Sequence, residues 1–137
     1  MTEEPSENRT FIHQKRSWWR KFDDAFRGIF QSIRQQSSYR IHFFFALIVP
    51  IVSLLLRLHL WEWCFLILLI AVVIATEMLN SAIETLSRVV TDEYDERIRL
   101  ALDISSGAVL VVSIFAAILG TIIFATAFWR IVAGNGA

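Results

Sequence analysis

Hydrophobic residues gather into three long runs along this chain, and each run is long enough to predict a membrane-crossing helix. A helix needs about 20 predominantly apolar residues to cross the core of a bilayer. The runs predict transmembrane helices over about residues 41–57, 61–90 and 104–130. Pro50 lies inside the first run, where proline is expected to kink a helix. The pattern therefore predicts an all-α integral membrane protein with three transmembrane helices.

An amphipathic segment precedes the first run. Between about residues 15 and 36, apolar residues recur at helical spacing and basic residues lie mostly off that stripe; the apolar positions are Trp18, Phe22, Phe26, Ile29 and Ile33. Aromatic and basic residues together are typical of a helix that lies on a membrane surface. The alternative is that the apolar stripe packs on the other helices. Residues 1–12 are polar and predicted to be disordered, which leaves residues 13–137 as a single membrane domain.

Composition and charge support this class and add an orientation. The chain is 55% hydrophobic with a mean hydropathy of +0.53, too apolar for an ordinary soluble domain of 137 residues. Its formal net charge is +0, but basic residues crowd the first 40 positions. By the positive-inside rule, the N-terminus and the connection over residues 91–102 are predicted to be cytoplasmic. The single cysteine, Cys64, excludes an intramolecular disulfide and a cysteine-based metal site.

A stripe of polar residues interrupts the second run where the surrounding sequence is apolar. Glu77, Asn80, Ser81 and Glu84 follow the i, i+3, i+4, i+7 spacing and so lie on one face of a helix. A charged side chain at bilayer depth costs about 2.5 to 3.5 kcal/mol even on the milder insertion scale. These carboxylates therefore need a partner, a metal ion or a water-filled pocket.

Several chemistries fit this stripe. Glu84 is suited to bind a hard divalent cation together with phosphate oxygens, and Glu77 to act as a general base toward a substrate hydroxyl. Asp103 precedes the third run, where it either caps the helix or contacts a nucleotide. Intramembrane carboxylates also serve as proton carriers, so a small proton- or ion-conducting oligomer is a further alternative.

Four segments together resemble the prokaryotic diacylglycerol kinase family, which also includes undecaprenol kinases. Residues 77–84 (EMLNSAIE) are similar to its signature, 25–29 (AFRGI) to its surface helix, 39–42 (YRIH) to the start of its first span, and 103–110 (DISSGAVL) to the start of its third helix. The resemblance implies a homotrimer of three-span subunits in the bacterial inner (cytoplasmic) membrane. It also implies transfer of the ATP γ-phosphate to a lipid alcohol with Mg²⁺, and no nucleic-acid partner.

The same resemblance assigns roles to individual residues. Glu77 takes the place of the catalytic base at the lipid hydroxyl, Asn80 of its polar partner in the active site, and Glu84 of a metal ligand. The remaining positions are Gln36 as the other metal ligand, Glu93, Tyr94, Asp95 and Asp103 as nucleotide contacts, and Ser106 and Arg40 as lipid-substrate contacts.

Ser87 stands where the family signature has a small apolar residue, and three further positions depart from the family pattern on the metal and phosphate side. Gln36 stands where the family has a glutamate, Leu102 where it has a lysine, and Arg88 where its signature ends in aspartate. Arg88 follows Glu84 by four residues, the favourable order for a helical ion pair, and is expected to compete with metal for that carboxylate. Arg97 or Arg99 is the candidate to replace the missing lysine.

These departures keep a second reading open. In it, the chain is a catalytically impaired family member that binds lipid or nucleotide without efficient turnover. Diacylglycerol and undecaprenol are not distinguished by the sequence, because both present one hydroxyl on a long apolar tail.

Overall fold

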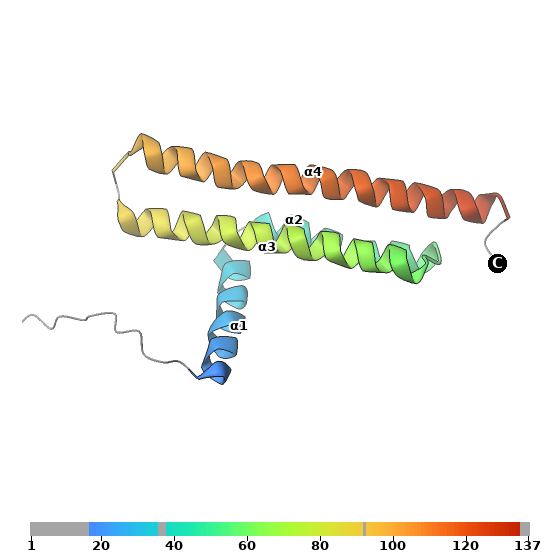
Figure 1. The fold of residues 1–137 in the computed structure, drawn as a ribbon, viewed down its shortest axis with the longest axis horizontal. Coiled ribbons are helices and arrows are strands. Elements are labelled where there is room, and N and C mark those ends of the chain that lie inside the picture. The colour runs from blue at the N-terminus through green and yellow to red at the C-terminus, as the bar shows by residue number, and fades with distance from the viewer. Residues whose placement is uncertain (1–16, 36–37, 92, 135–137) are drawn as a thin grey trace, which may run out of the picture.

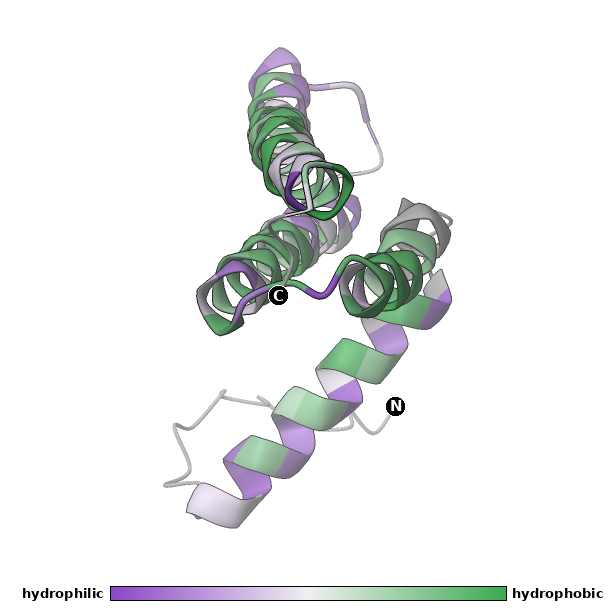
Figure 2. Cartoon of the chain, turned by 90° about the vertical axis from the view of Figure 1, so that its right-hand side faces the viewer, coloured by the Kyte–Doolittle hydropathy of each residue, from purple (hydrophilic) through white to green (hydrophobic). Residues whose placement is uncertain are grey.

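The described part of the chain forms four helices in a computed structural model, which describes residues 17–35, 38–91 and 93–134, with only the backbone described for 35 and 38–43. They are α1 (Trp18–Gln35), α2 (Ser38–Leu55), α3 (Leu60–Val90) and α4 (Glu96–Val132). Helices α3 and α4 form an antiparallel hairpin, and α2 packs along α3 (Figures 1 and 2). Helix α1 runs across the direction of the other three (Figure 1).

Two of these helices are long and apolar enough to cross a membrane. Helices α3 and α4 contain 31 and 37 residues, and at 1.5 Å per residue both exceed the roughly 30 Å core of a bilayer. The described apolar part of α2, Phe44–Leu55, is shorter. The transmembrane character of α2 therefore stays a prediction. Helix α2 continues through Pro50 as far as Leu55.

The start of α4 lies ahead of the predicted third transmembrane span. The helix begins at Glu96, two turns before that span near residue 104. Its N-cap is Asp95, whose Oδ1 accepts a hydrogen bond from the Arg97 backbone N–H at 2.8 Å. Glutamate, arginine and leucine are good helix formers, so the charged stretch is helical although it is not apolar. Asp103 lies inside the helix and does not cap it.

The interface between α3 and α4 holds the hairpin together. The buried residues of α3 recur at spacings of three, four and seven, the pattern of a helix packed along a partner helix; they are Glu62, Leu66, Val73, Glu77, Asn80 and Ser81. This buried face of α3 is apolar in the middle, at Leu66 and Val73, and polar toward both ends. The polar residues at the loop end are those that the sequence singled out.

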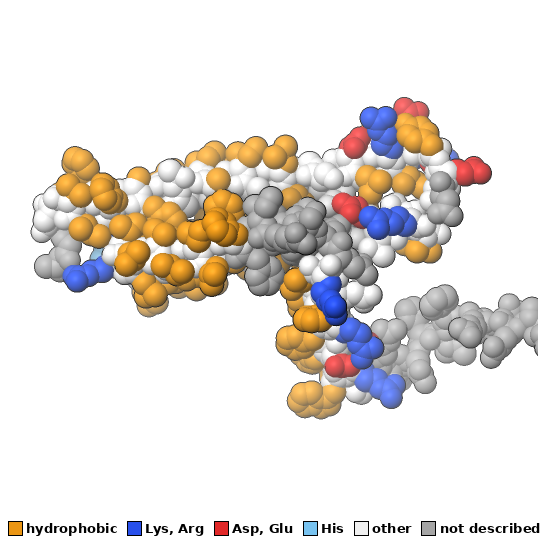
Figure 3. Space-filling model, turned by 180° about the vertical axis from the view of Figure 1, so that it is seen from behind, with side chains coloured by type: hydrophobic (Ala, Val, Ile, Leu, Met, Phe, Trp, Pro, Cys, Tyr) orange, Lys and Arg blue, Asp and Glu red, His pale blue; other side chains and the backbone are white. Residues whose placement is uncertain are grey.

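Most apolar side chains of the hairpin face outward. The most apolar stretch of α4 contains no buried residue, and apolar side chains cover the long bundle surface (Figure 3). Charged side chains gather instead at the α3–α4 loop end and along α1 (Figure 3). Contact between water and such an apolar surface is unfavourable. The surface is therefore suited to contact with lipid or with other protein chains.

Candidate active site at the loop end of the α3–α4 hairpin

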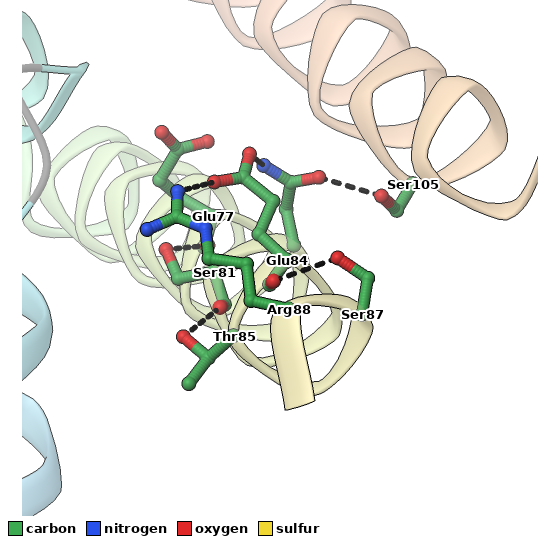
Figure 4. Close-up of polar contacts among 8 residues, drawn as sticks. Glu77, Ser81, Glu84, Thr85, Ser87, Arg88 and Ser105 are labelled. Atoms are coloured by element: carbon green, nitrogen blue, oxygen red, sulfur yellow. Dashed lines mark hydrogen bonds and ion pairs between the residues drawn. The ribbon is translucent and has the colours of Figure 1, made fainter. Parts of the chain in front are cut away.

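The polar stripe of α3 meets α4 through one short hydrogen bond. Ser105 Oγ donates to Asn80 Oδ1 at 2.6 Å, and Asn80 Nδ2 donates to Glu84 Oε1 at 3.0 Å (Figure 4). Asn80 and Ser105 are both buried, at 8% exposure. The amide of Asn80 is therefore held at both ends, and it orients the Glu84 carboxylate.

Glu77 is the deepest acidic residue of the stripe. It is 3% exposed, and its carboxylate projects on the same side of α3 as that of Glu84 (Figure 4). Ser81 Oγ donates to the backbone carbonyl of Glu77 at 2.9 Å and leaves the carboxylate itself untouched. Within the described part of the chain, no hydrogen bond or ion pair is made by this carboxylate. A buried carboxylate of this kind costs free energy unless a hydrogen-bond donor contacts it.

Glu84 is more accessible and already has a cationic neighbour. Its side chain is 30% exposed, and Arg88 Nη2 lies 4.0 Å from Glu84 Oε2. The ion pair predicted from the i, i+4 spacing is thus present. Among the described residues, no three acidic, histidine or cysteine side chains gather into a metal cluster. Any divalent cation at Glu84 would need further oxygen ligands, such as those of a bound phosphate.

The residues predicted to contact nucleotide lie around the connection and the first turns of α4. Tyr94 is exposed and its hydroxyl accepts a hydrogen bond from Arg99 Nη1 at 3.2 Å, while Arg99 Nε lies 3.8 Å from Asp103 Oδ2. Arg99 thus joins Tyr94 to Asp103. Glu93 is exposed, and its backbone N–H donates to Thr91 Oγ1 at 2.9 Å.

Asp95 is engaged within its own helix. One carboxylate oxygen accepts the Arg97 backbone N–H, and Arg97 Nη2 lies 3.4 Å from the other. Both hydrogen bonds from Arg97 lower the pKa of Asp95 below its ordinary value, and the one from the backbone N–H has the larger effect. The geometry gives Asp95 a capping role, whatever else it contacts.

The Asn80–Ser105 contact gives a reference point on each helix. Rotation about each helix axis, counted from these two residues, shows which side chains of α3 and α4 lie on the same side of the hairpin. Counting about 100° per residue from Asn80, Glu77 and Glu84 are rotated by about 60° and 40°. Counted from Ser105 on α4, Leu102 and Arg99 are rotated by about 60° and 120°. Because the helices are antiparallel, rotations of the same sign point to the same side of the hairpin. Glu77, Glu84, Leu102 and Arg99 therefore share one face.

Arg97 is excluded from this face by the same count. It is rotated by about 80° in the opposite sense from Ser105, and its side chain is 93% exposed. Ser106 is rotated by about 100° toward the shared face and is exposed. Of the two arginines that the sequence left open, Arg99 is thus the one beside Leu102.

Residues 23–124 match the family described as prokaryotic diacylglycerol kinase. The chain belongs to this family. It is 33% identical over 107 residues to a protein named undecaprenol kinase from Bacillus subtilis (strain 168), a match that covers 78% of this chain and 87% of the relative. It is also 33% identical over 100 residues to a protein named diacylglycerol kinase from Synechocystis, covering 72% of this chain and 57% of that longer relative. No solved structure matches the chain significantly.

An apolar groove continues the shared face toward the far end of the hairpin. This groove, with a volume of about 440 Å³, is lined by α2, α3 and α4. Its α3 side runs from Leu66 to Ile74, and its α4 side from Ser113 to Phe124. Ile74 is three residues from Glu77, so the groove ends one helical turn from the buried carboxylate. Polar site and apolar groove thus form one continuous track.

Two predicted site residues fall outside what the structure describes. Gln36 lies outside the described residues, and so does the side chain of Arg40. Conversely, sequence reasoning named Ser106 and missed Ser105, which makes the contact to Asn80. The register between the two helices decides which of the adjacent serines faces α3, and the sequence of either helix alone carries no signal for it.

Proposed function

We propose that this family member is an ATP-dependent lipid kinase of the inner membrane. The hydroxyl oxygen of a lipid alcohol attacks the γ-phosphorus of ATP, and the bond between that phosphorus and the β,γ-bridging oxygen breaks. The hydroxyl proton leaves to a base, and the products are a lipid phosphate and ADP. The observation that carries the proposal is the continuous track from the apolar groove to Glu77 and on to Glu84.

The track matches the shape of the proposed substrate. A lipid alcohol has a long apolar tail and one polar end, and the groove is apolar up to one turn from Glu77. With the tail in the groove, the hydroxyl lies where the carboxylate can accept its proton. Asn80, held by Ser105, keeps the neighbouring Glu84 in place. The proton therefore moves from the lipid oxygen to Glu77.

The residues present are compatible with Mg²⁺ held largely by nucleotide. Magnesium is commonly bound through one or two carboxylates together with substrate phosphates, and Glu84 offers such a carboxylate on the shared face. The ion would supply charge neutralisation at the phosphates. The ion pair to Arg88 presents only a small obstacle, because exposed i, i+4 pairs contribute about 0.3 to 0.5 kcal/mol.

The nucleotide is proposed to lie at the loop end of the hairpin. Glu93, Tyr94 and Asp103 surround the first turns of α4, and Arg99 provides a guanidinium on the shared face. A guanidinium binds phosphate well and offsets charge that develops during transfer. Asp95 supports this region by capping α4.

We further propose that the chain spans the membrane three times and assembles as a homotrimer. The exposed apolar surface of α4 supports burial against lipid and neighbouring subunits. The basic N-terminal block supports a cytoplasmic N-terminus and α3–α4 connection. Cysteine labelling of intact cells, after removal of Cys64, tests this orientation. An externally added reagent should reach a cysteine at Arg57 and not one at Glu96, and the reverse result contradicts it.

The decisive experiment is a phosphorylation assay with purified protein in mixed micelles. Radiolabelled ATP is supplied with diacylglycerol or undecaprenol, with and without Mg²⁺. The proposal expects Mg²⁺-dependent label in one of these lipids and none with Glu77→Gln. Absence of labelled lipid under every condition, with retained lipid or nucleotide binding, favours the non-catalytic alternative. That alternative rests on the three departures Gln36, Leu102 and Arg88 taken together, and Arg88 pairs with Glu84.

A further inference from the structure

The hydroxyl of Ser113 is an exception among the hydroxyls of these helices. In a membrane helix, a serine or threonine hydroxyl usually donates to the carbonyl four residues earlier. Six described side chains do so, namely Ser53, Thr76, Ser81, Thr85, Thr121 and Thr126. Ser113 Oγ is almost completely covered, and within the described parts of the chain it has no hydrogen-bond partner. Such an atom costs free energy unless something else bonds to it.

This hydroxyl lines the apolar groove. Ser113 is the first groove residue of α4, at the end nearest the polar site. The other hydroxyl in the lining belongs to Thr121 and is satisfied, because it donates to the Ala117 carbonyl at 2.7 Å. Ser113 is therefore a groove residue whose hydrogen-bond donor is unused, among apolar neighbours. Its hydroxyl is covered in this conformation, and a rotation about the Cα–Cβ bond is what turns it toward a ligand.

Ser113 and Glu77 lie close enough in depth along the hairpin for one ligand to contact both. From the level of the Asn80–Ser105 contact, Glu77 is about 4.5 Å and Ser113 about 12 Å along the helix axes in the same direction. Side chains tilt toward the N-terminus of their helix, which moves Glu77 deeper and Ser113 toward the polar site. The backbones of the two residues are about 7.5 Å apart along the helix axes, and their side-chain oxygens are closer than that. A ligand held at Glu77 reaches Ser113 with a group a few bonds further along.

We propose that Ser113 donates a hydrogen bond to an ester carbonyl of a diacylglycerol-type substrate. In diacylglycerol, an ester carbonyl oxygen lies a few bonds from the free hydroxyl, and both acyl chains continue from the esters. With the hydroxyl at Glu77, the carbonyl lies toward Ser113 and the chains follow the groove. The proposal rests on the proposed kinase function and adds the substrate class.

The same donor discriminates against a polyprenol. A polyprenol carries only alkene and methyl groups beyond its hydroxyl and has no acceptor at this depth. Bound there, it leaves Ser113 buried and unpaired, whereas an acylglycerol satisfies it. Ser113 is therefore a specificity-determining residue that favours an acylglycerol over a polyprenol.

The test compares three lipids that differ at the carbonyl. Wild type and Ser113→Ala are assayed with a diacylglycerol, with the matching dialkylglycerol ether, which lacks carbonyls, and with a polyprenol. The substitution should lower kcat/KM for the ester by about 2- to 12-fold, the range expected for one hydrogen bond. It should leave the ether and the polyprenol unchanged. Thr121→Val is the matched control in the same groove, since its hydroxyl bonds only its own helix, and it should not change the ester-to-ether ratio.

Binding provides a readout that does not need turnover. Displacement of a pyrene-labelled diacylglycerol by unlabelled ester or ether gives the same ratio from affinities. An ester preference in wild type that Ser113→Ala removes supports the proposal, even where no lipid is phosphorylated and the kinase function itself fails. An ester-to-ether ratio that Ser113→Ala leaves unchanged overturns it, and so does a wild-type preference for the polyprenol.

Discussion

Arg130 donates one hydrogen bond to each oxygen of the Glu62 carboxylate, both at 3.0 Å. The Glu62 side chain is 1% exposed and that of Arg130 25%. Glu62 also accepts the His59 backbone N–H at 2.7 Å and so closes the first turn of α3. The pair joins the start of α3 to the last turn of α4, at the end opposite the polar site. It therefore helps to fix the register on which the Asn80–Ser105 contact depends.

Breaking this pair from one side should destabilise the hairpin strongly. Arg130→Met leaves a buried carboxylate without its cation, which typically costs about 3 to 5 kcal/mol. The thermal midpoint in detergent should fall clearly, whereas Arg57→Met, at an exposed arginine of the same end, should change it little. The double variant Glu62→Leu with Arg130→Met removes both charges and should be more stable than Arg130→Met alone. A double variant no more stable than Arg130→Met would show that the unpaired Glu62 charge is not the source of the destabilisation.

Glu77→Gln should abolish lipid phosphorylation while the protein stays folded and assembled. The amide keeps the shape of the carboxylate and cannot accept the hydroxyl proton. Turnover at saturating ATP is the measurement, and Glu96→Gln, on the exposed first turn of α4, is the control. Near-normal turnover would remove Glu77 from the role of base. Proton flux into liposomes should be recorded as well, because flux without phosphorylation favours the ion-conducting alternative.

The sequence predicted the polar stripe well because periodicity within one helix is a local property. Glu77, Asn80 and Glu84 lie on one face of any helix, and in the structure Glu77 and Asn80 are buried and Asn80 donates to Glu84. The same local logic anticipated the Glu84–Arg88 pair. The helical nature of each apolar run followed from its length, although Pro50 lies inside the first run.

Contacts between helices could not be predicted in the same way. Ser105 faces Asn80 and Arg130 reaches Glu62 only because α3 and α4 pack in one particular register. Residue patterns within each helix allow several registers. The exact start of α4 at Glu96 could not be predicted for another reason. Hydrophobicity locates the expected membrane span, whereas helix formation in the charged turns before it follows helix propensity and the Asp95 cap.

The Asp95 cap should make the α4 start sensitive to acid. Hydrogen bonds from Arg97 lower the pKa of Asp95 in the folded chain below its value in the unfolded chain. Its stabilising contribution is therefore complete above the unfolded pKa, about 4, and is lost as pH falls through the lower folded pKa. Wild type should be more stable than Asp95→Asn at pH 7, and the difference should shrink below about pH 4. A difference in thermal midpoint that stays constant with pH would contradict this.

Arg99 should matter more for ATP than Arg97. Both arginines pair with an acidic residue near the start of α4, but only Arg99 lies on the face shared with Glu84. Arg99→Ala should raise KM for ATP about tenfold or more, the loss expected for one charge-assisted contact. Arg97→Ala should change it little. If Arg97→Ala has the larger effect, the assignment of faces from the Asn80–Ser105 contact is wrong.

Restoring the charged residues that the family has at positions 36 and 102 should strengthen the binding of metal and phosphate. Gln36→Glu adds an anionic oxygen ligand, and Leu102→Lys adds an ammonium on the face of Glu84. Together they should lower the Mg²⁺ and ATP concentrations needed for half-maximal turnover, by tens of fold or more at about 1.5 kcal/mol or more per charge-assisted contact. Adding Arg88→Asp should help further, because it frees Glu84 from its ion pair. Leu102→Met is the matched control, since it changes shape without adding charge. Slower turnover in the restored protein than in wild type would mean that the site is built around other cations. Arg99→Ala in the wild-type protein would then be the first variant to test.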